Sequence, residues 1–526
     1  MIGKKNRNKF KEDSLKKRYG FKLFSSFFSY GISAVIQLMV PRSLGPEVYG
    51  NFGFMTTFFD NLVGSLEVGS STWFYTKLSQ KKDDKKIIIF YRYIIVVIVL
   101  IILIFVVTAT STIIHQKLWL GQSNQIIYLA MLFSIMTWIL TVKNKVIDAY
   151  GLTVDAEKGK IIQRIVALVI ISVLFFINKL NLFSFFIYNY FIIIILWILF
   201  DLIIRKRGFY KGFNFRLSIE ENKKYIKNLF KYINPLIGLI TIAFVIGFLD
   251  RWLLQKFGGS IQQGFYTLSL KIGAVYFLFA RSLTQLLTRE FSVAFGKNDI
   301  NQMRFMFRRY IPLIYGIIAY FACFVATQSD RIIYIIGGNE YEGARVVMII
   351  MAFYPIHQSY GQLSNAIFYA TGNTKLYRNI GLSGLLLGLP LTYFLLAPES
   401  MMGLNAGATG LAIKMVLVQF ISVNIGLYFN TRLLSLPFYK FLLHQFVSIG
   451  IMVIVAVGTR LGMDNILILK NNIILSFLLS GIIYTILIVV IGNYFPKLFG
   501  LDKKTIWKLK KRLVNWINNI ISKIKK

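Results

Sequence analysis

The chain has 526 residues, of which 56% are hydrophobic, and it carries a formal net charge of +38. A charge of that size could indicate a nucleic-acid partner, but the Lys and Arg residues lie in the gaps between long apolar stretches, which excludes that class. The single cysteine, Cys323, excludes an intramolecular disulfide and a cysteine-cluster metal site.

Fourteen apolar stretches follow one another along the chain, and each is long enough to cross the hydrocarbon core of a membrane as a helix. The pattern therefore predicts an all-α polytopic membrane protein with about 14 transmembrane helices. The predicted spans are 21–41, 49–75, 87–114, 124–149, 161–178, 181–204, 229–254, 263–290, 310–328, 344–370, 377–397, 403–430, 441–463 and 471–495.

The positive charge alternates between the gaps. When residues at the ends of spans are counted with the adjoining gap, 48 of the 60 Lys and Arg residues fall in the N-terminal segment and every second gap after it, 9 fall in the other gaps, and three lie deep inside spans. Cytoplasmic loops are the ones enriched in Lys and Arg. We therefore expect both termini to be cytoplasmic, the gaps at 42–48 and 329–343 to face outward, and the protein to be a multi-pass protein of the bacterial plasma (inner) membrane.

The order of spans and gaps divides the chain into five parts. The N-lobe covers 1–208 with helices 1–6, a basic cytoplasmic linker covers 209–228, and the C-lobe covers 229–435 with helices 7–12. Helices 13 and 14 follow in 436–496. The tail 497–526 is basic and amphipathic, so we expect it to lie on the anionic cytoplasmic leaflet.

The two lobes resemble each other. The glycines Gly45 and Gly50 after helix 1 are aligned with Gly258 and Gly264 after helix 7, with a one-residue insertion, and Gly151 after helix 4 is aligned with Gly372 after helix 10. Six helices separate the copies, so both have the same orientation. We expect two parallel six-helix repeats around a central cleft, with alternating access by rocking of one lobe against the other.

The segment Arg42-Ser43-Leu44-Gly45-Pro46-Glu47-Val48-Tyr49-Gly50 carries a family resemblance, supported by the Ala-x-Gly segments at 149–151 and 370–372 and the run 405–412. It resembles the start of the Wzx-type polysaccharide flippases of the multidrug/oligosaccharidyl-lipid/polysaccharide exporter superfamily. This resemblance implies movement of an undecaprenyl-pyrophosphate-linked oligosaccharide from the inner to the outer leaflet. It implies the lipid-linked oligosaccharide, membrane lipids and polysaccharide-assembly proteins as partners, with no cofactor.

Five charged residues lie well away from the ends of predicted spans and are candidate site residues. Lys271 and Arg281 in helix 8 and Lys414 in helix 12 either form a cationic substrate site or neutralise other charges within the bundle. Asp60 and Glu67 in helix 2 share one helical face and are candidate gate residues. An offset of 214 places Glu67 on Arg281, so the two could meet across the cleft.

Other polar residues have ordinary explanations at this stage. Asp250 and Arg251 lie near the outer end of helix 7, where solvated charge is common. His357 lies in the middle of helix 10, where a neutral, hydrogen-bonded ring is favoured over a titrating one.

Three other functions are weighed against the flippase. A peptidoglycan-precursor flippase shares the fourteen-helix layout. A drug/cation antiporter of the same superfamily often has an acid in helix 1, which the span 21–41 does not contain. A membrane glycosyltransferase or polymerase usually needs a large outer loop, and the longest outer gap has about 15 residues. The sequence contains no nucleotide-binding loop and no metal-ligand spacing, so a transporter is favoured over an enzyme.

Overall fold

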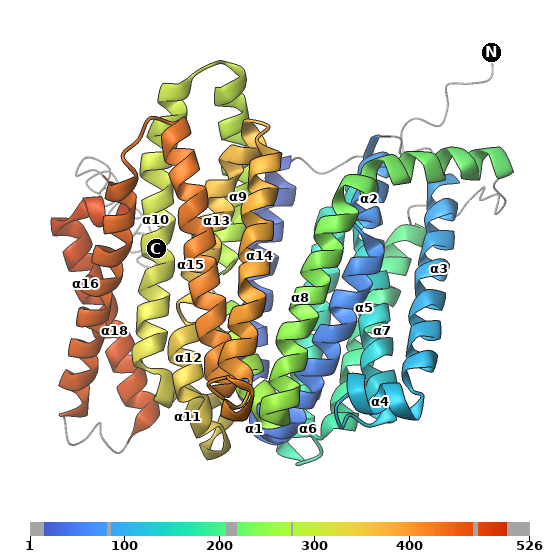
Figure 1. Cartoon of the computed structure of the whole chain (residues 1–526), viewed down its shortest axis with the longest axis horizontal. Coiled ribbons are helices and arrows are strands. Elements are labelled where there is room, and N and C mark those ends of the chain that lie inside the picture. The colour runs from blue at the N-terminus through green and yellow to red at the C-terminus, as the bar shows by residue number, and fades with distance from the viewer. Residues whose placement is uncertain (1–14, 81–85, 207–217, 275–276, 466–471, 502–526) are drawn as a thin grey trace, which may run out of the picture. The chain divides into compact units, whose positions relative to one another are not determined.

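The structure is a computed structural model that describes residues 15–80, 86–206, 218–274, 277–465 and 472–501. Within these ranges the chain forms helices and turns, without a strand. The predicted all-α polytopic membrane fold is confirmed (Figure 1). The chain divides into two compact units, 1–267 and 268–526, and the division falls inside the long helix α8.

Unit 1 begins with the long helix α1 and contains most of α8. α1 packs against α5 and α6, and α7 packs against both of these helices. α5 begins after an N-cap, where the Ser123 side chain accepts a hydrogen bond from the Ile126 N–H. The helices are α1 (Leu15–Glu67), α2 (Ser70–Gln80), α3 (Lys86–Ala109), α4 (Thr112–Leu118), α5 (Asn124–Ala149), α6 (Thr153–Phe176), α7 (Leu182–Lys206) and α8 (Ile219–Ala274).

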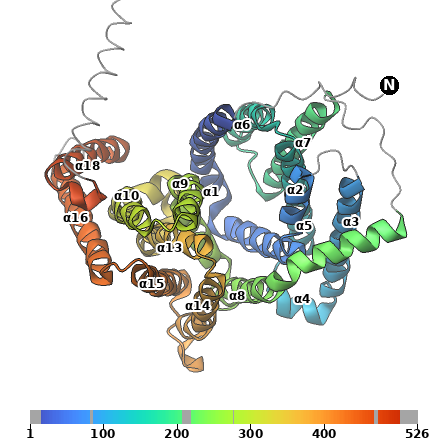
Figure 2. The same ribbon diagram turned by 90° about the horizontal axis from the view of Figure 1, so that it is seen from above.

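Unit 2 has its core around α10, which packs against α9, α13 and α16 (Figure 2). α13 also contacts α15, which lies along α14, and α16 lies along α18. Apolar side chains such as Ile314, Ala322 and Leu363 are fully buried between these helices. The helices are α9 (Phe277–Gly296), α10 (Ile300–Thr327), α11 (Ser329–Gly337), α12 (Arg345–Met351), α13 (Tyr354–Ala370), α14 (Thr374–Leu396), α15 (Gly407–Leu433), α16 (Phe438–Asp464) and α18 (Ile473–Tyr494), with the 3-10 turns η1 (Asn339–Ala344), η2 (Glu399–Met401) and η3 (Pro496–Phe499).

Among the described residues, 11 helices are long and apolar enough to cross a membrane. Two of them, α1 and α8, bend at Gly45 and Gly259, and each contains one predicted span and the first part of the next. Some predicted spans are broken. The predicted span 49–75 is interrupted at Val68 and Gly69, both with positive φ, and the predicted span 344–370 is divided into α12 and α13.

The predicted repeat appears in the backbone, with one correction. Gly45 has φ 71° and ψ 168°, and the glycine with the same conformation in the second copy is Gly259, with φ 73° and ψ −173°, not Gly258. No insertion is needed, because Gly45 and Gly50 are both 214 residues before their counterparts. Gly151 and Gly372 also match, since each has a positive φ just after α5 or α13.

The five predicted parts of the chain are described to different extents. α8 begins at Ile219, so the second half of the predicted linker 209–228 is helical. Residues 209–217 and 502–526, which include most of the predicted amphipathic tail, lie outside the described residues. The assignment of the N-lobe to 1–208 and the C-lobe to 229–435 stays a prediction.

Candidate functional site

Lys271 in α8 and Arg281 in α9 lie on either side of residues 275–276, which are outside the described residues, and Lys414 lies in α15. Lys414 is buried in α15 against α14, where a Cβ atom at Gly388 would lie 2.8 Å from the Lys414 Cε atom. The Lys414 side chain is thus held between two helices and does not extend to the membrane surface. Lys271 is half-buried near the end of α8. Arg281 belongs to α9, but its side chain lies outside the described part of the chain.

The two predicted acids lie on the second half of α1. Asp60 is exposed. Glu67 is the last residue of α1 and is largely buried. Its predicted pairing with Arg281 stays a prediction, because the Arg281 side chain is not described.

Glu67 has contacts within unit 1. One carboxylate oxygen accepts a hydrogen bond from the Trp138 Nε1–H at 3.0 Å, and the other accepts from the backbone N–H of Ser71 at 3.1 Å. The Lys145 Nζ atom lies 3.8 Å from the carboxylate and also donates to the Ser71 hydroxyl. Glu67 therefore joins the break between α1 and α2 to the middle of α5.

A polar pocket of about 550 Å³ lies among α1, α5, α6 and α7. The hydroxyl group of Thr137 and the side-chain carbonyl of Asn144 are buried there without a hydrogen-bond partner in the structure. Such groups are costly to leave unsatisfied, so a polar ligand would stabilise them. The hydroxyl and amide lining includes Ser25, Ser26, Ser29, Ser33, Thr137, Thr141, Asn144, Gln163 and Asn189.

The charged lining of the polar pocket is mainly positive. Lys22, Lys160 and Arg164 line it, with Glu157 as the one carboxylate among the pocket residues. The Lys160 Nζ atom lies 2.6 Å from the Glu157 carboxylate. The pocket therefore combines neutral donors and acceptors with an excess of cations, although sequence patterns singled out none of these residues.

The two bent helices α1 and α8 meet at their glycines, at a place we call the glycine contact. A Cβ atom added at Gly50 would lie 1.9 Å from the carbonyl oxygen of Ser260, and one added at Gly264 would lie 2.0 Å from that of Pro46. Pro46 and Ser260 are also 214 residues apart. The contact is reciprocal, as expected for two copies related by a two-fold axis.

Polar side chains surround the glycine contact. The Asn51 side-chain carbonyl accepts hydrogen bonds from Gln122 Nε2 and Ser260 Oγ, each at 2.6 Å. Asp250 and Arg251 are buried close by, which corrects the expectation that they are solvated.

Arg251 occupies the same place in the second copy as Gln37 in the first. Its Nη1 atom donates to Gln263 Oε1 at 2.9 Å, while the Tyr49 hydroxyl donates to Gln37 Oε1 at 3.0 Å. The Arg251 guanidinium also lies 4.4 Å from the centre of the Tyr266 ring. The sequence did not predict burial of the Arg251 charge, because its partners Gln263 and Tyr266 lie beyond the bend at Gly259.

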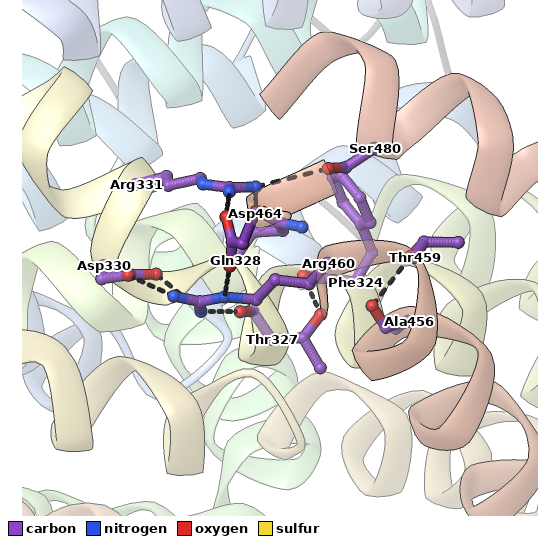
Figure 3. A network of polar contacts seen from close by, with 10 residues as sticks. All are labelled: Phe324, Thr327, Gln328, Asp330, Arg331, Ala456, Thr459, Arg460, Asp464 and Ser480. Carbon is purple, nitrogen blue, oxygen red and sulfur yellow. Dashed lines mark hydrogen bonds and ion pairs between the residues drawn. The ribbon is translucent and has the colours of Figure 1, made fainter. Parts of the chain in front are cut away.

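A second charge cluster, also missed by sequence reasoning, joins α10 and α11 to α16 and α18 (Figure 3). The Arg460 guanidinium binds both carboxylate oxygens of Asp330, at 2.9 and 2.5 Å. Buried Arg331 pairs with Asp464 and donates to Gln328 Oε1 at 2.7 Å. The cluster borders a pocket of about 570 Å³.

Asp330 lies outside the membrane-spanning helices and has a perturbed pKa. Burial by itself raises the pKa of its carboxyl group, but the hydrogen bonds and positive charge of Arg460 outweigh burial, and the pKa is held below its ordinary value. Among the described residues, no three His, Cys, Asp or Glu side chains are grouped as a metal site requires.

Comparisons with known proteins give the fold. The MatE family model matches residues 235–394. The chain is similar to the structure of lipid II flippase MurJ in an inward closed conformation, with 14% identity over 90% of this chain and 98% of that chain and a TM-score of 0.62. It is also similar to an inward-facing multidrug resistance MATE family transporter of the MOP superfamily, with 14% identity over 77% of this chain and 94% of that chain and a TM-score of 0.57. No curated protein matches the chain.

Fold and helices together define the class of this protein. It is a multi-pass, all-α membrane protein with the fold of MOP-superfamily transporters and flippases. Within that fold, residues 235–394 match the MatE model, and this segment includes Ser260 and Gly264, the α8 side of the glycine contact.

Proposed function

We propose that the protein is a flippase that moves an undecaprenyl-pyrophosphate-linked oligosaccharide from the inner to the outer leaflet by alternating access. The polar pocket carries this proposal. Sugar hydroxyl groups both donate and accept hydrogen bonds, as do the Ser, Thr, Asn and Gln side chains that line it. Lys22, Lys160 and Arg164 add the positive charge that a pyrophosphate requires.

The charge balance of the polar pocket disfavours a cationic drug as the substrate. Three cationic side chains surround one carboxylate, and that carboxylate is already paired with Lys160. A cation entering this pocket would be repelled, whereas an anionic headgroup would be attracted. In the predicted topology the charged lining residues Lys22, Glu157, Lys160 and Arg164 lie at the cytoplasmic ends of their helices, where a substrate made in the cytoplasm is loaded.

The glycine contact supports alternating access. The gaps at 42–48 and 255–262 are predicted to face outward, so contact between α1 and α8 closes the outer side. Two backbones packed this closely through glycine can separate without leaving large side-chain cavities. We further propose that the predicted substrate residues Arg281, Lys271 and Lys414 bind the pyrophosphate at another stage of the cycle than the polar pocket does, and that Asp60 and Glu67 act at the gate.

Reconstituted protein tests the proposal. Proteoliposomes carrying a fluorescent undecaprenyl-pyrophosphate-linked trisaccharide, lipid II or a cationic dye are treated with a membrane-impermeant quencher. We expect the protein to accelerate transfer of the trisaccharide lipid between leaflets. Faster movement of lipid II alone would assign the protein as a peptidoglycan-precursor flippase, the second candidate, and movement of the dye alone would assign it as a drug antiporter.

Variants test the residues. The double substitution Thr141→Val with Asn144→Leu should slow transfer roughly tenfold, because losing hydrogen bonds worth about 1.4 kcal/mol is a factor of ten. Thr108→Val with Thr110→Val is the control, since both hydroxyl groups lie at the end of α3, outside the polar pocket. Arg281→Ala should abolish transfer, and Arg281→Lys should restore part of it because paired hydrogen bonding is lost.

A further inference from the structure

A second pocket in unit 1, the cationic pocket, is separate from the polar pocket and encloses about 690 Å³ among α3, α5 and α7. Three cationic side chains line it, Arg92, Lys143 and Arg205, with Asp201 as the one carboxylate among its lining residues. The rest of its lining is mostly aromatic and aliphatic. It therefore combines a charged rim with an apolar floor, as the binding site of an amphipathic molecule requires.

The base of the charged rim is a largely buried ion pair. The Lys143 Nζ atom lies 3.0 Å from the Asp201 carboxylate, donates to the Trp197 carbonyl at 3.2 Å, and lies 3.8 Å from the centre of the Trp197 ring. Arg205 also pairs with Asp201. One carboxylate thus serves at least two cations, and the pocket as a whole has an excess of two positive charges.

The position of the cationic pocket favours a lipid as its ligand. It lies at the ends of α3, α5 and α7 that carry the positive charge of the predicted cytoplasmic side. Apolar side chains beside it are exposed, including Tyr93 at 47% and Leu202 at 55%, as expected for surfaces that face lipid. Anionic headgroups of the cytoplasmic leaflet bind in basic pockets between transmembrane helices.

We propose that the cationic pocket binds an anionic glycerophospholipid of the inner leaflet through its phosphodiester. Arg92 and Arg205 hold the phosphate oxygens, and an acyl chain lies on the apolar floor formed by residues such as Ile95. Asp201 accepts a hydrogen bond from a hydroxyl group of the headgroup, as phosphatidylglycerol provides. A glycerophospholipid also supplies an acyl chain for the apolar floor, which a free inorganic anion lacks.

Lipid binding is measured on the purified full-length protein by native mass spectrometry, independently of transport. Arg92→Gln with Arg205→Gln should weaken phosphatidylglycerol binding at least fivefold and leave the melting temperature in detergent nearly unchanged. Arg289→Gln with Arg378→Gln removes two arginines outside the pocket and should change binding less than twofold. Equal binding by the two double variants would overturn the proposal.

Competing ligands identify the occupant. Phosphatidylglycerol should bind at least fivefold more tightly than phosphatidylcholine, and millimolar inorganic pyrophosphate should not displace it. Tighter binding of undecaprenyl pyrophosphate through the same arginines would overturn the glycerophospholipid assignment, and full displacement by inorganic pyrophosphate would leave only an anion site. Ile95→Trp, which keeps every charge, should also weaken binding severalfold, and unchanged binding would refute the placement of the acyl chain.

Discussion

The charged residues inside the predicted spans differ in how far they are buried and in which side chains they contact. Lys414 is enclosed between α15 and α14, whereas Asp60 of α1 is exposed. Glu67 is bonded to Trp138 and Ser71 and lies near Lys145. A buried charge is retained only where such partners compensate its desolvation. The sequence predicted which charges lie in spans, but their partners come from other helices.

Glu67 provides a residue-scale prediction. If its contact with Lys145 contributes to stability, Glu67→Gln and Lys145→Gln should couple in a double-mutant cycle by about 0.5–1 kcal/mol, because the 3.8 Å pair is partly exposed. Thermal or denaturant unfolding in detergent measures this coupling. Additive effects of the two substitutions would show that the pair contributes nothing to stability.

A second pair of substitutions, at Glu67 and Arg281, tests the predicted gate. Glu67→Gln should impair transfer between leaflets, and if Glu67 meets Arg281 during transport, Glu67→Arg should partly rescue Arg281→Glu in the proteoliposome assay. The double variant could restore transfer while the effects of the two substitutions on the free energy of unfolding stay additive. That result would mean that Glu67 and Arg281 pair only in one conformation of the transport cycle. If the double variant is no better than Arg281→Glu alone at matched expression, direct pairing is not supported.

Helix bends and breaks explain where the elements differ from simple spans. Gly45 and Gly259 take positive φ values that other residues adopt only with strain, so α1 and α8 can bend there and continue. Hydropathy predicted the spans on both sides of these bends, because each side is apolar for long enough. It could not show the break at Val68 and Gly69, since apolar content alone does not specify φ.

The glycine contact gives a prediction for these elements. Gly50→Ala or Gly264→Ala should destabilise the structure by about 1–3 kcal/mol, because the added methyl group would overlap a backbone carbonyl oxygen. Both substitutions should also slow transfer, since the outer side could not close. Gly64→Ala is the control, because open space surrounds that position, and it should be tolerated. Equal melting temperatures and transfer rates for all three variants would remove the contact from the working cycle.

The Asp330–Arg460 pair gives a pH-dependent prediction for the contact of α11 with α16. Because the folded pKa of Asp330 is lowered, its contribution to stability is fully present above the unfolded pKa and is lost as the pH falls through the folded pKa. Asp330→Asn should therefore lower the melting temperature at pH 6. This difference from the original protein should shrink below about pH 4.

Thermal scans between about pH 2.5 and 6 measure this effect. Glu340→Gln, which removes an exposed carboxylate of η1, is the control for the loss of one negative charge near this contact. A difference between Asp330→Asn and the original protein that stays constant with pH would exclude titration of Asp330 as the cause.

For the whole molecule, the sequence predicted the helical class and the repeat, but only part of the site. Lys414 was recognised because it interrupts an apolar run, and the repeat because glycines recur at nearly constant spacing. Arg251, Arg331 and Arg460 were missed because they lie near helix ends, where charge usually meets water. Their burial depends on residues far away in the chain, such as Ser480 for Arg331 and Thr327 for Arg460.

The orientation in the membrane is the last prediction, and it rests on the alternation of charge between gaps. Lys and Arg are retained on the cytoplasmic side during insertion, so the set of gaps with 48 of these residues should be cytoplasmic and the set with 9 should be outside. Glu340 on η1 belongs to the second set and Lys158 on α6 to the first, and both side chains are exposed. Cys323 is buried, so the natural sequence supplies little competing reaction with a thiol reagent.

In intact cells, Glu340→Cys should react with an impermeant thiol reagent and Lys158→Cys should react only after permeabilisation. The reverse pattern would invert the topology, and the glycine contact would then close the cytoplasmic side, which is incompatible with loading of a cytoplasmic substrate in this conformation.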